Sequence, residues 1–343
     1  MDEYKYNDYE NYNYVEMNVT AHEEPVSQPR APCQHFSCVS LLVASVVIFL
    51  LGFCGNGLVI WISGFKMRKS VNTTWYLSLA ISDFIFCTFL PFSIANTAME
   101  NWIFGHFMCK FVSFVLFLNM FSSIFLLVVI SIDRCISVVH PVWAQNHRTV
   151  NKASVVVVLS WLLAIALSLP SVLFRDSQTY MERTICFNNY PDVDTHKAVA
   201  YGRFLAGFAA PFTIIVVCYS IIIAKLRSNR MTKSSKPFKV MTALVATFFI
   251  CWLPYHVFVL LELQVDRHNH NVLAHGLKIA VSLAAANSFL NPVLYVFMGN
   301  DFKQKVRRSV LSKMENAMAE DGRTTSRYLS RSSSMDARAS THI

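Results

Sequence analysis

Ionisable side chains are rare within the long apolar stretches of this chain, and one of them is suited to binding a cation. Asp83 is the only Lys, Arg, Asp or Glu between residues 70 and 99. A lone carboxyl group is costly to expose to lipid, so we expect it to face a polar interior. Side-chain oxygens recur at helical spacing on two other apolar stretches, at Asn119, Ser123, Asn287, Ser288 and Asn291. Hard cations prefer such ligands, whereas the alternative is a protonated Asp83 with a structural role.

A second set of charges borders the apolar stretches. Arg203 lies eight residues before Pro211, Arg175 follows one apolar stretch, and Lys278 precedes another. We expect these cations to face a water-filled mouth rather than lipid, beneath an acidic rim that includes Glu262. Because Arg can bind a carboxylate through two parallel hydrogen bonds, the pattern favours a peptide that enters with its C-terminal carboxylate. Snorkelling of the three cations to a membrane interface is the alternative.

Seven apolar segments must position these groups. One of them, 70–99, contains only Asp83, and the other six contain no Lys, Arg, Asp or Glu: 38–65, 111–132, 153–174, 204–224, 240–261 and 279–300. A helix needs about 20 residues to cross the hydrocarbon core of a membrane, and every segment is long enough. Only 15% of the 343 residues are charged, compared with about 25% in soluble domains. The sequence therefore predicts an all-α membrane protein with a seven-transmembrane helix bundle.

Basic residues are distributed unevenly between the connecting segments. Eleven Lys and Arg, with no Asp or Glu, occupy three of them: 66–71, 140–152 and 225–239. Seven basic and seven acidic residues occupy the three that alternate with these: 99–110, 175–203 and 262–278. Loops rich in Lys and Arg stay on the cytoplasmic side, which predicts an extracellular N-terminus and a cytoplasmic C-terminus in the plasma membrane. The net charge of +9 is then a topology signal beside anionic lipid, and no nucleic-acid partner is expected.

Polar ends flank the predicted bundle of residues 38–298. Residues 1–37 are expected to form an acidic, Tyr-rich extracellular tail, in which Asn18 begins a glycosylation sequon. No apolar signal region precedes the first segment, which must serve as its own insertion signal. Residues 299–314 predict a short amphipathic eighth helix along the inner membrane surface. The cytoplasmic tail, 315–343, contains the expected phosphorylation sites Ser326, Ser330, Ser332, Ser333, Ser334 and Ser340.

Each apolar segment also carries a short motif. In chain order these are Gly55-Asn56, Leu79-Ala80-Ile81-Ser82-Asp83, Asp133-Arg134-Cys135, Trp161, Pro211 with Tyr219, Cys251-Trp252-Leu253-Pro254 and Asn291-Pro292-Val293-Leu294-Tyr295. One such motif alone would be weak evidence, but all seven occur in order and each lies on its own segment. Over about residues 38–313 the chain therefore resembles the rhodopsin-class G-protein-coupled receptors.

This resemblance implies an activation switch at the cytoplasmic end of the third segment. Arg134 would pair with Asp133 at rest and swing out to contact a G protein, with a merely snorkelling Arg as the alternative. Cys135 replaces the commonest Tyr, and Ser234 stands where some members place an acidic partner for the Arg, so the resting lock should be weaker. The other residues implied in the switch are Tyr219, Trp252, Tyr295, Ile124, Pro211 and Phe248.

The resemblance also implies an ion site and a disulfide bond. Cys109 and Cys186 would connect the third segment to the second outer loop, while the pairing of Cys33 and Cys38 stays open. No cofactor or other metal is expected beyond an allosteric sodium ion. The implied sodium ligands are Asp83, Asn119, Ser123, Asn287 and Asn291.

A ligand pocket is implied between the outer ends of the segments. Leu116 replaces the Asp of amine receptors and Ala285 replaces the retinal-binding Lys of opsins, so neither an amine nor retinal is expected. The residues implied to bind the ligand are Arg203, Arg175, Lys278, Glu262, Asn119, Leu116, Trp252 and Tyr255.

Longer matches narrow the resemblance to one branch of the family. Residues 141–148, 174–176 and 186–190 resemble the chemerin receptors of the chemoattractant branch. They imply a peptide or protein ligand similar to chemerin, inhibitory G proteins that lead to chemotaxis and calcium release, and receptor kinases and arrestin as further partners. One alternative is a formyl-peptide-like receptor, which would carry an acidic residue in place of Phe117. Another is a decoy receptor that internalises ligand without signalling, and an enzyme is not expected.

Overall fold

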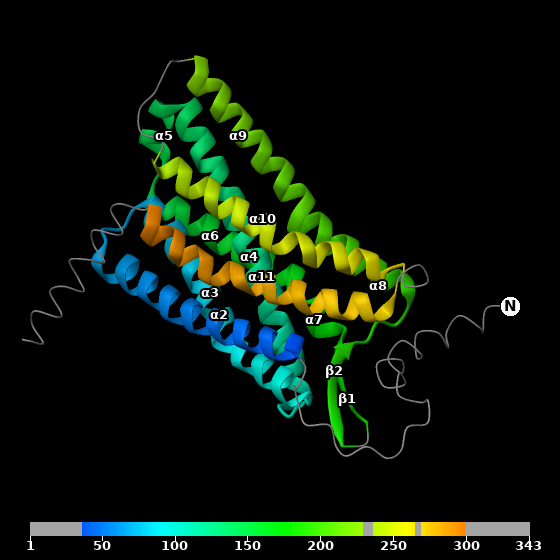
Figure 1. Ribbon diagram of the computed structural model, residues 1–343. Coiled ribbons are helices and arrows are strands. Elements are labelled where there is room, and N and C mark those ends of the chain that lie inside the picture. Colours follow the sequence, from blue (N-terminus) through cyan, green and yellow to red (C-terminus); the bar gives the residue numbers. More distant parts are fainter. Residues whose placement is uncertain (1–35, 181, 229–235, 265–268, 299–343) are drawn as a thin grey trace, which may run out of the picture.

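Seven membrane-spanning helices form the body of the molecule (Figure 1). The computed structural model describes residues 36–180, 182–228, 236–264 and 269–298. Within these ranges, seven helices are long and apolar enough to cross a membrane, which confirms the predicted all-α bundle. The predicted tails, with Asn18 and the six tail serines, and the predicted eighth helix at 299–314 lie outside the described residues.

Six of the seven spans are longer than the apolar segments that predicted them, and several are built from more than one helical piece. The pieces are α2 (Phe36–Trp61) with η1 (Ile62–Lys66), α3 (Val71–Met99), α4 (Gly105–Val139), α6 (Val150–Ser168) with α7 (Pro170–Leu173), α8 (Val193–Phe204) with η2 (Leu205–Ala209) and α9 (Ala210–Ser228), α10 (Lys236–Glu262) and α11 (His270–Met298). Pro211 explains the π-helical turn η2, because it has no backbone N–H to donate to the preceding turn. A further short helix, α5 (Pro141–His147), connects α4 to α6.

Side-chain caps determine where several helices begin. Ser70 forms a capping box with Thr73 at the start of α3, and the Thr149 hydroxyl accepts a hydrogen bond from the backbone N–H of Lys152 at the start of α6. Asp192 caps α8 by accepting from the backbone N–H of Thr195 at 2.6 Å. That N–H holds the pKa of the Asp192 carboxyl below its usual range. These contacts satisfy backbone donors that the helix itself leaves unpaired.

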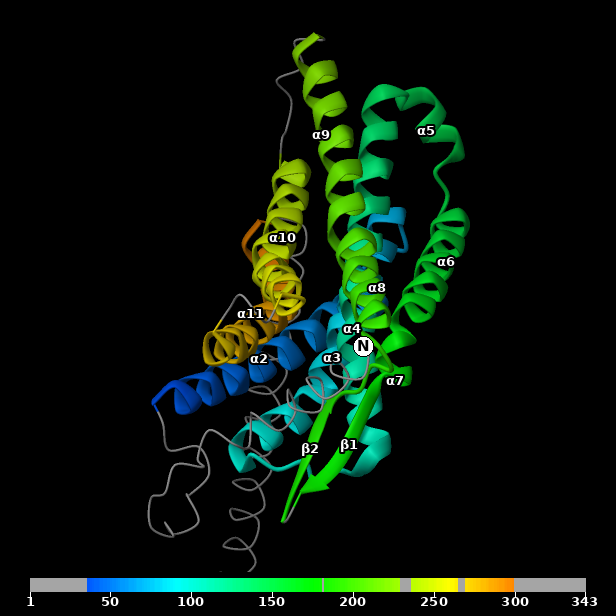
Figure 2. The same ribbon diagram turned by 90° about the vertical axis from the view of Figure 1, so that its right-hand side faces the viewer.

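A β-hairpin covers one end of the bundle, opposite to the end where α5 lies (Figures 1 and 2). Strands β1 (Arg175–Tyr180) and β2 (Arg183–Asn188) pair antiparallel, with Arg175 opposite Asn188. The predicted disulfide between Cys109 and Cys186 is present and attaches β2 to α4. Cys38, at the start of α2, is also disulfide-bonded. The sequence pattern indicated only an outer loop here and did not predict the hairpin.

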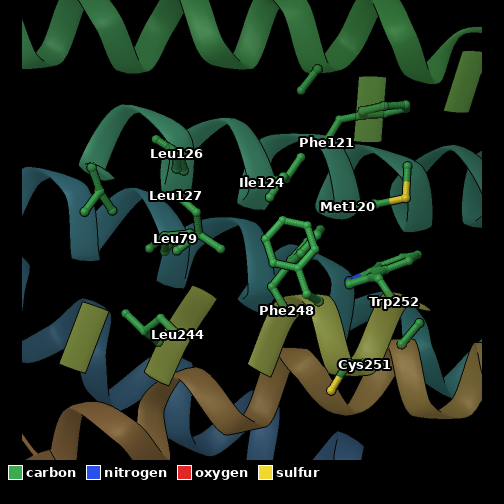
Figure 3. Close-up of a cluster of buried hydrophobic side chains, with 14 of the residues drawn as sticks. Leu79, Met120, Phe121, Ile124, Leu126, Leu127, Leu244, Phe248, Cys251 and Trp252 are labelled. Carbon is green, nitrogen blue, oxygen red and sulfur yellow. The ribbon is translucent and has the colours of Figure 1, made fainter. Parts of the chain in front are cut away.

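The helix α4 lies at the centre of the bundle and contributes many of the buried core residues. Its buried side chains pack against α3, α6, α9 and α10. Figure 3 shows part of this contact, where Phe248 and Trp252 of α10 lie beside Ile124 and Met120 of α4. Apolar side chains also cover the outer surface of helices such as α6. That surface suits lipid, since lipid tails solvate apolar side chains without cost.

Candidate ligand pocket and signalling site

Arg203 is a buried cation at the hairpin end of the bundle. It lies on α8 with only 7% of its surface exposed. Its guanidinium carbon lies 3.7 Å from the centre of the Phe117 ring, and its Nη2 donates a hydrogen bond to the Ser171 hydroxyl at 3.1 Å. Its Nε has no hydrogen-bond partner among the described residues. An unpaired buried donor on a guanidinium group favours the binding of an anion such as a carboxylate.

Aromatic side chains surround this cation. Tyr255 is buried within reach of the Arg203 guanidinium, and its ring lies 5.7 Å from that of Trp252. His256, also buried, packs edge-on against Phe204. The ring nitrogens Trp252 Nε1 and His256 Nε2 lack hydrogen-bond partners within the described part of the chain. The surroundings of Arg203 therefore combine apolar rings with polar atoms that are unpaired among the described residues, which is the composition of small ligand sites.

Arg175 is held by the hairpin rather than pointing freely into the mouth. Its Nη2 donates to the carbonyl oxygen of Cys186 and its Nη1 to Asn188 Oδ1, both at 3.0 Å. Burial lowers the pKa of the Arg175 guanidinium to about 10, so the group remains positive at neutral pH. Arg203 and Glu262 both lie close enough to act on its charge. The charges of the two arginines and of Glu262 therefore influence one another, while a shared pocket that also includes Lys278 stays a prediction.

The other predicted ligand-binding residues are distributed between the rim and the bundle interior. Lys278 is exposed on α11, and Leu116 is partly buried on α4. Asn119 lies in a different network, because its Nδ2 donates to Asp83 Oδ1 at 2.9 Å. Ser171 and His256 were not among the residues predicted from the sequence to bind the ligand. A serine and a histidine within an apolar run were the only signal for them, and such residues are common in helices that carry no ligand.

A polar network fills the centre of the bundle around Asp83, which is fully buried. Asn291 Nδ2 donates to Asp83 Oδ2 at 2.7 Å, and Asn119 donates to the other carboxylate oxygen. Ser123 Oγ and Asn287 Oδ1 are buried without hydrogen-bond partners in the described ranges. The predicted sodium ligands are therefore all buried polar groups, and two of them have free oxygen atoms. Because hard cations bind oxygen ligands, this donor set fits a sodium ion.

A charged cluster lies at the opposite end, where α4 approaches α5. Arg134 Nη2 lies 3.2 Å from Asp133 Oδ2, as predicted for the resting pair. A second arginine, Arg148, binds both carboxylate oxygens of Asp133, with Nε at 2.6 Å and Nη2 at 2.9 Å. Asn72 Oδ1 accepts hydrogen bonds from both arginines. The sequence analysis predicted the Arg134–Asp133 pair but not its sharing with Arg148 and Asn72.

The sequence matches the model of a known family. Residues 55–295 match the model of the rhodopsin family of seven-transmembrane receptors, and the matched region contains the seven motifs and the disulfide. The chain belongs to this family. It is therefore a receptor rather than an enzyme, and a multi-pass protein of the plasma membrane.

Individual relatives place the receptor among chemoattractant receptors. It is 46% identical to chemerin-like receptor 1 of Sus scrofa over 302 residues, which cover 82% of this chain and 83% of the relative. It is 47% identical to chemerin-like receptor 1 of Rattus norvegicus over 303 residues, covering 82% and 81% of the two chains. N-formyl peptide receptor 2 of Macaca mulatta is 44% identical over 304 residues, covering 83% and 87%.

The remaining residues predicted for the switch lie mostly in the interior of the bundle. Ile124 and Phe248 are fully buried (Figure 3), and Pro211 is buried at the start of α9. Phe248 stacks on Trp252 at 6.0 Å between ring centres. Tyr219 lies partly buried on α9. The predicted residue Tyr295 belongs to α11, but its side chain lies outside the described residues.

Proposed function

We propose that the receptor binds a peptide or protein ligand similar to chemerin and signals through inhibitory G proteins to chemotaxis and calcium release. The observation that carries this proposal is the buried Arg203 beside Phe117, with an unpaired Nε atom. A C-terminal carboxylate can satisfy that donor and neutralise a charge that has no acidic partner within hydrogen-bonding distance among the described residues. Relatives that are named as chemerin-like receptors support the ligand class.

The hairpin end of the bundle suits such a ligand if that end faces the outside of the cell. Disulfides persist in oxidising compartments, and the Cys109–Cys186 bond lies at that end. The basic connecting segments 66–71, 140–152 and 225–239 belong to the other ends of the spans, where the positive-inside rule puts the cytoplasm. In this orientation the acidic N-terminal segment is extracellular and attracts basic surfaces of the ligand.

A formyl-peptide-like receptor is the alternative, because formyl peptide receptors are also relatives. The contact between Arg203 and Phe117 favours chemerin, since an apolar ring leaves the charge of Arg203 available for the ligand. The presence of both Asp133 and Arg134 in contact disfavours a decoy receptor, which would not need that pair.

The experiment compares two forms of one peptide. Cells that express the receptor are given the C-terminal peptide of chemerin with either a free acid or an amidated C-terminus, and calcium and cAMP responses are recorded. A charge-assisted hydrogen bond contributes roughly 1.5–3 kcal/mol, so Arg203→Ala should weaken the acid peptide by about 10- to 100-fold. The amide should lose much less potency.

Controls separate the alternatives. Lys197→Ala removes an exposed charge on the same helix, α8, and should change potency far less than Arg203→Ala does. Equal losses for acid and amide would show that Arg203 does not bind the carboxylate. A response to formyl peptides without any response to chemerin or its peptide would instead support the formyl-peptide receptor.

We further propose two regulatory partners. A sodium ion bound at Asp83 would stabilise the resting receptor, supported by the unpaired oxygens of Ser123 and Asn287. Phosphorylation of the tail serines by receptor kinases would add negative charge among Arg residues and recruit arrestin. Truncation after Met318 should then leave G-protein activation intact and slow internalisation.

A further inference from the structure

Asp133 is bound more closely by Arg148 than by its sequence neighbour Arg134. Arg148, in the segment between α5 and α6, approaches both carboxylate oxygens, whereas Arg134 makes one longer contact of 3.2 Å. Two parallel hydrogen bonds from one guanidinium group form the strongest kind of carboxylate contact. Asp133 therefore forms its main ion pair with Arg148 rather than with Arg134.

The two arginines also act on each other. Arg148 lies close enough to Arg134 for their positive charges to repel, and both donate to the same oxygen of Asn72. The exposed fractions of the Asp133, Arg134 and Arg148 side chains are 12%, 20% and 27%. Partly buried charges are screened by salt less than exposed ones, so the repulsion between the arginines is felt at physiological ionic strength.

We propose that Arg148 is a positioning residue that competes with Arg134 for Asp133 and thereby eases the release of Arg134 during activation. This inference rests on the proposed signalling function. It assigns to the segment between α5 and α6 a control over Arg134, whose expected acidic partner is replaced by Ser234 in this sequence. A resting receptor without Arg148 would pair Asp133 with Arg134 alone, and the resting state would be more stable.

The test is a double-mutant cycle on the full-length receptor. In the first arm, basal nucleotide exchange on an inhibitory G protein is compared for wild type and Arg148→Ala. The variant should lower basal exchange by about 3- to 10-fold, the effect of one charge-assisted contact in a partly exposed site. In an Asp133→Asn background, Arg148→Ala should leave basal exchange unchanged, because the two arginines no longer have a carboxylate for which to compete.

A second arm works without a G protein. A more stable resting state must weaken agonist affinity, so the Kd of purified Arg148→Ala for the C-terminal peptide of chemerin should rise by about 3- to 10-fold. Arg148→Lys keeps the charge but not the two parallel bonds, so it should give an intermediate value and covers the case in which the alanine variant is unstable. Lys152→Ala removes an exposed charge one turn further along the chain and should leave both measurements unchanged.

The outcomes are distinguishable. Higher basal exchange in Arg148→Ala would overturn the inference, because Arg148 would then restrain the receptor. An equal decrease with and without the Asp133 carboxylate would also overturn it, because Arg148 would then only support the local fold. Absence of nucleotide exchange by wild type would contradict the proposed function instead, and the affinity arm would still test the competition.

Discussion

At the scale of single residues, burial decides what a polar group can do. Asp83 has both carboxylate oxygens bonded by asparagine amides, while Ser123 Oγ and Asn287 Oδ1 lack partners within the described ranges. An unpaired buried acceptor costs about 1–3 kcal/mol. A cation bound by these oxygens would remove that cost. If activation moves the helices that carry the oxygens apart, the cation stabilises the resting state only.

Sodium should therefore lower agonist affinity. We expect wild type to bind the C-terminal peptide of chemerin at least about 5-fold more weakly in sodium chloride than in choline chloride of equal ionic strength. Asp83→Asn should abolish this difference, because the amide cannot neutralise the ion. Binding is measured by competition with a labelled peptide. Ser160→Ala, which removes a hydroxyl bonded only within its own helix, should behave as wild type, and a sodium effect that survives in Asp83→Asn would locate the ion elsewhere.

At the scale of elements, close approach of helices depends on small residues. Gly276 of α11 faces Phe258 of α10 so closely that an added Cβ would lie 2.1 Å from the Phe258 ring. Such a distance is far below van der Waals contact, so the ring or the helix would have to move. Gly202 of α8 has no atom within 4 Å of the corresponding position, and it provides an internal comparison.

Substitution of the two glycines should therefore have opposite effects. Gly276→Ala should destabilise the receptor by about 1–3 kcal/mol, the usual cost of overpacking. Gly202→Ala should stabilise it by roughly 0.5–1 kcal/mol, because alanine has the higher helix propensity. Thermal unfolding of the detergent-solubilised proteins measures both changes. A Gly276→Ala protein as stable as wild type would show that Phe258 can turn away without loss.

At the scale of the whole molecule, one disulfide connects the hairpin to the centre of the bundle. The bond between Cys109 and Cys186 closes a loop with a sequence separation of 77 residues. The Arg175 side chain donates a hydrogen bond to the Cys186 carbonyl oxygen in β2. The disulfide therefore holds both the hairpin and the Arg175 guanidinium in place relative to α4. Loss of the bond should therefore affect folding and ligand binding together.

Cys109→Ser should abolish ligand binding or surface expression. Removal of a native disulfide costs roughly 2–5 kcal/mol, and the hairpin would no longer be fixed above the pocket. Surface labelling and peptide binding on intact cells measure the two effects. Cys54→Ser replaces an exposed free cysteine and should match wild type, whereas normal binding by Cys109→Ser would show that the hairpin holds its place without the bridge.

The sequence by itself determined the architecture and the type of each site. Seven charge-free or nearly charge-free segments require helices, because lipid offers no hydrogen bonds to the backbone. Asp83 was expected to face inward because a lone carboxyl group is costly to expose to lipid, and the same cost favoured an Arg203 that faces the mouth over one that snorkels to the membrane interface. The motifs then identified the family, and residues at helical spacing indicated the polar network around Asp83.

Only the tertiary structure decided which side chains share a partner. The hairpin was not predicted, because its strands contain mixed polar residues and are stabilised by a disulfide to α4 and by contacts with Asn101 and Trp102. The cluster of Arg148, Asp133 and Asn72 joins residues on two helices and a loop, and no local pattern encodes that geometry. Helical periodicity specifies the face on which a residue lies, but the distances across the bundle depend on how all seven spans pack.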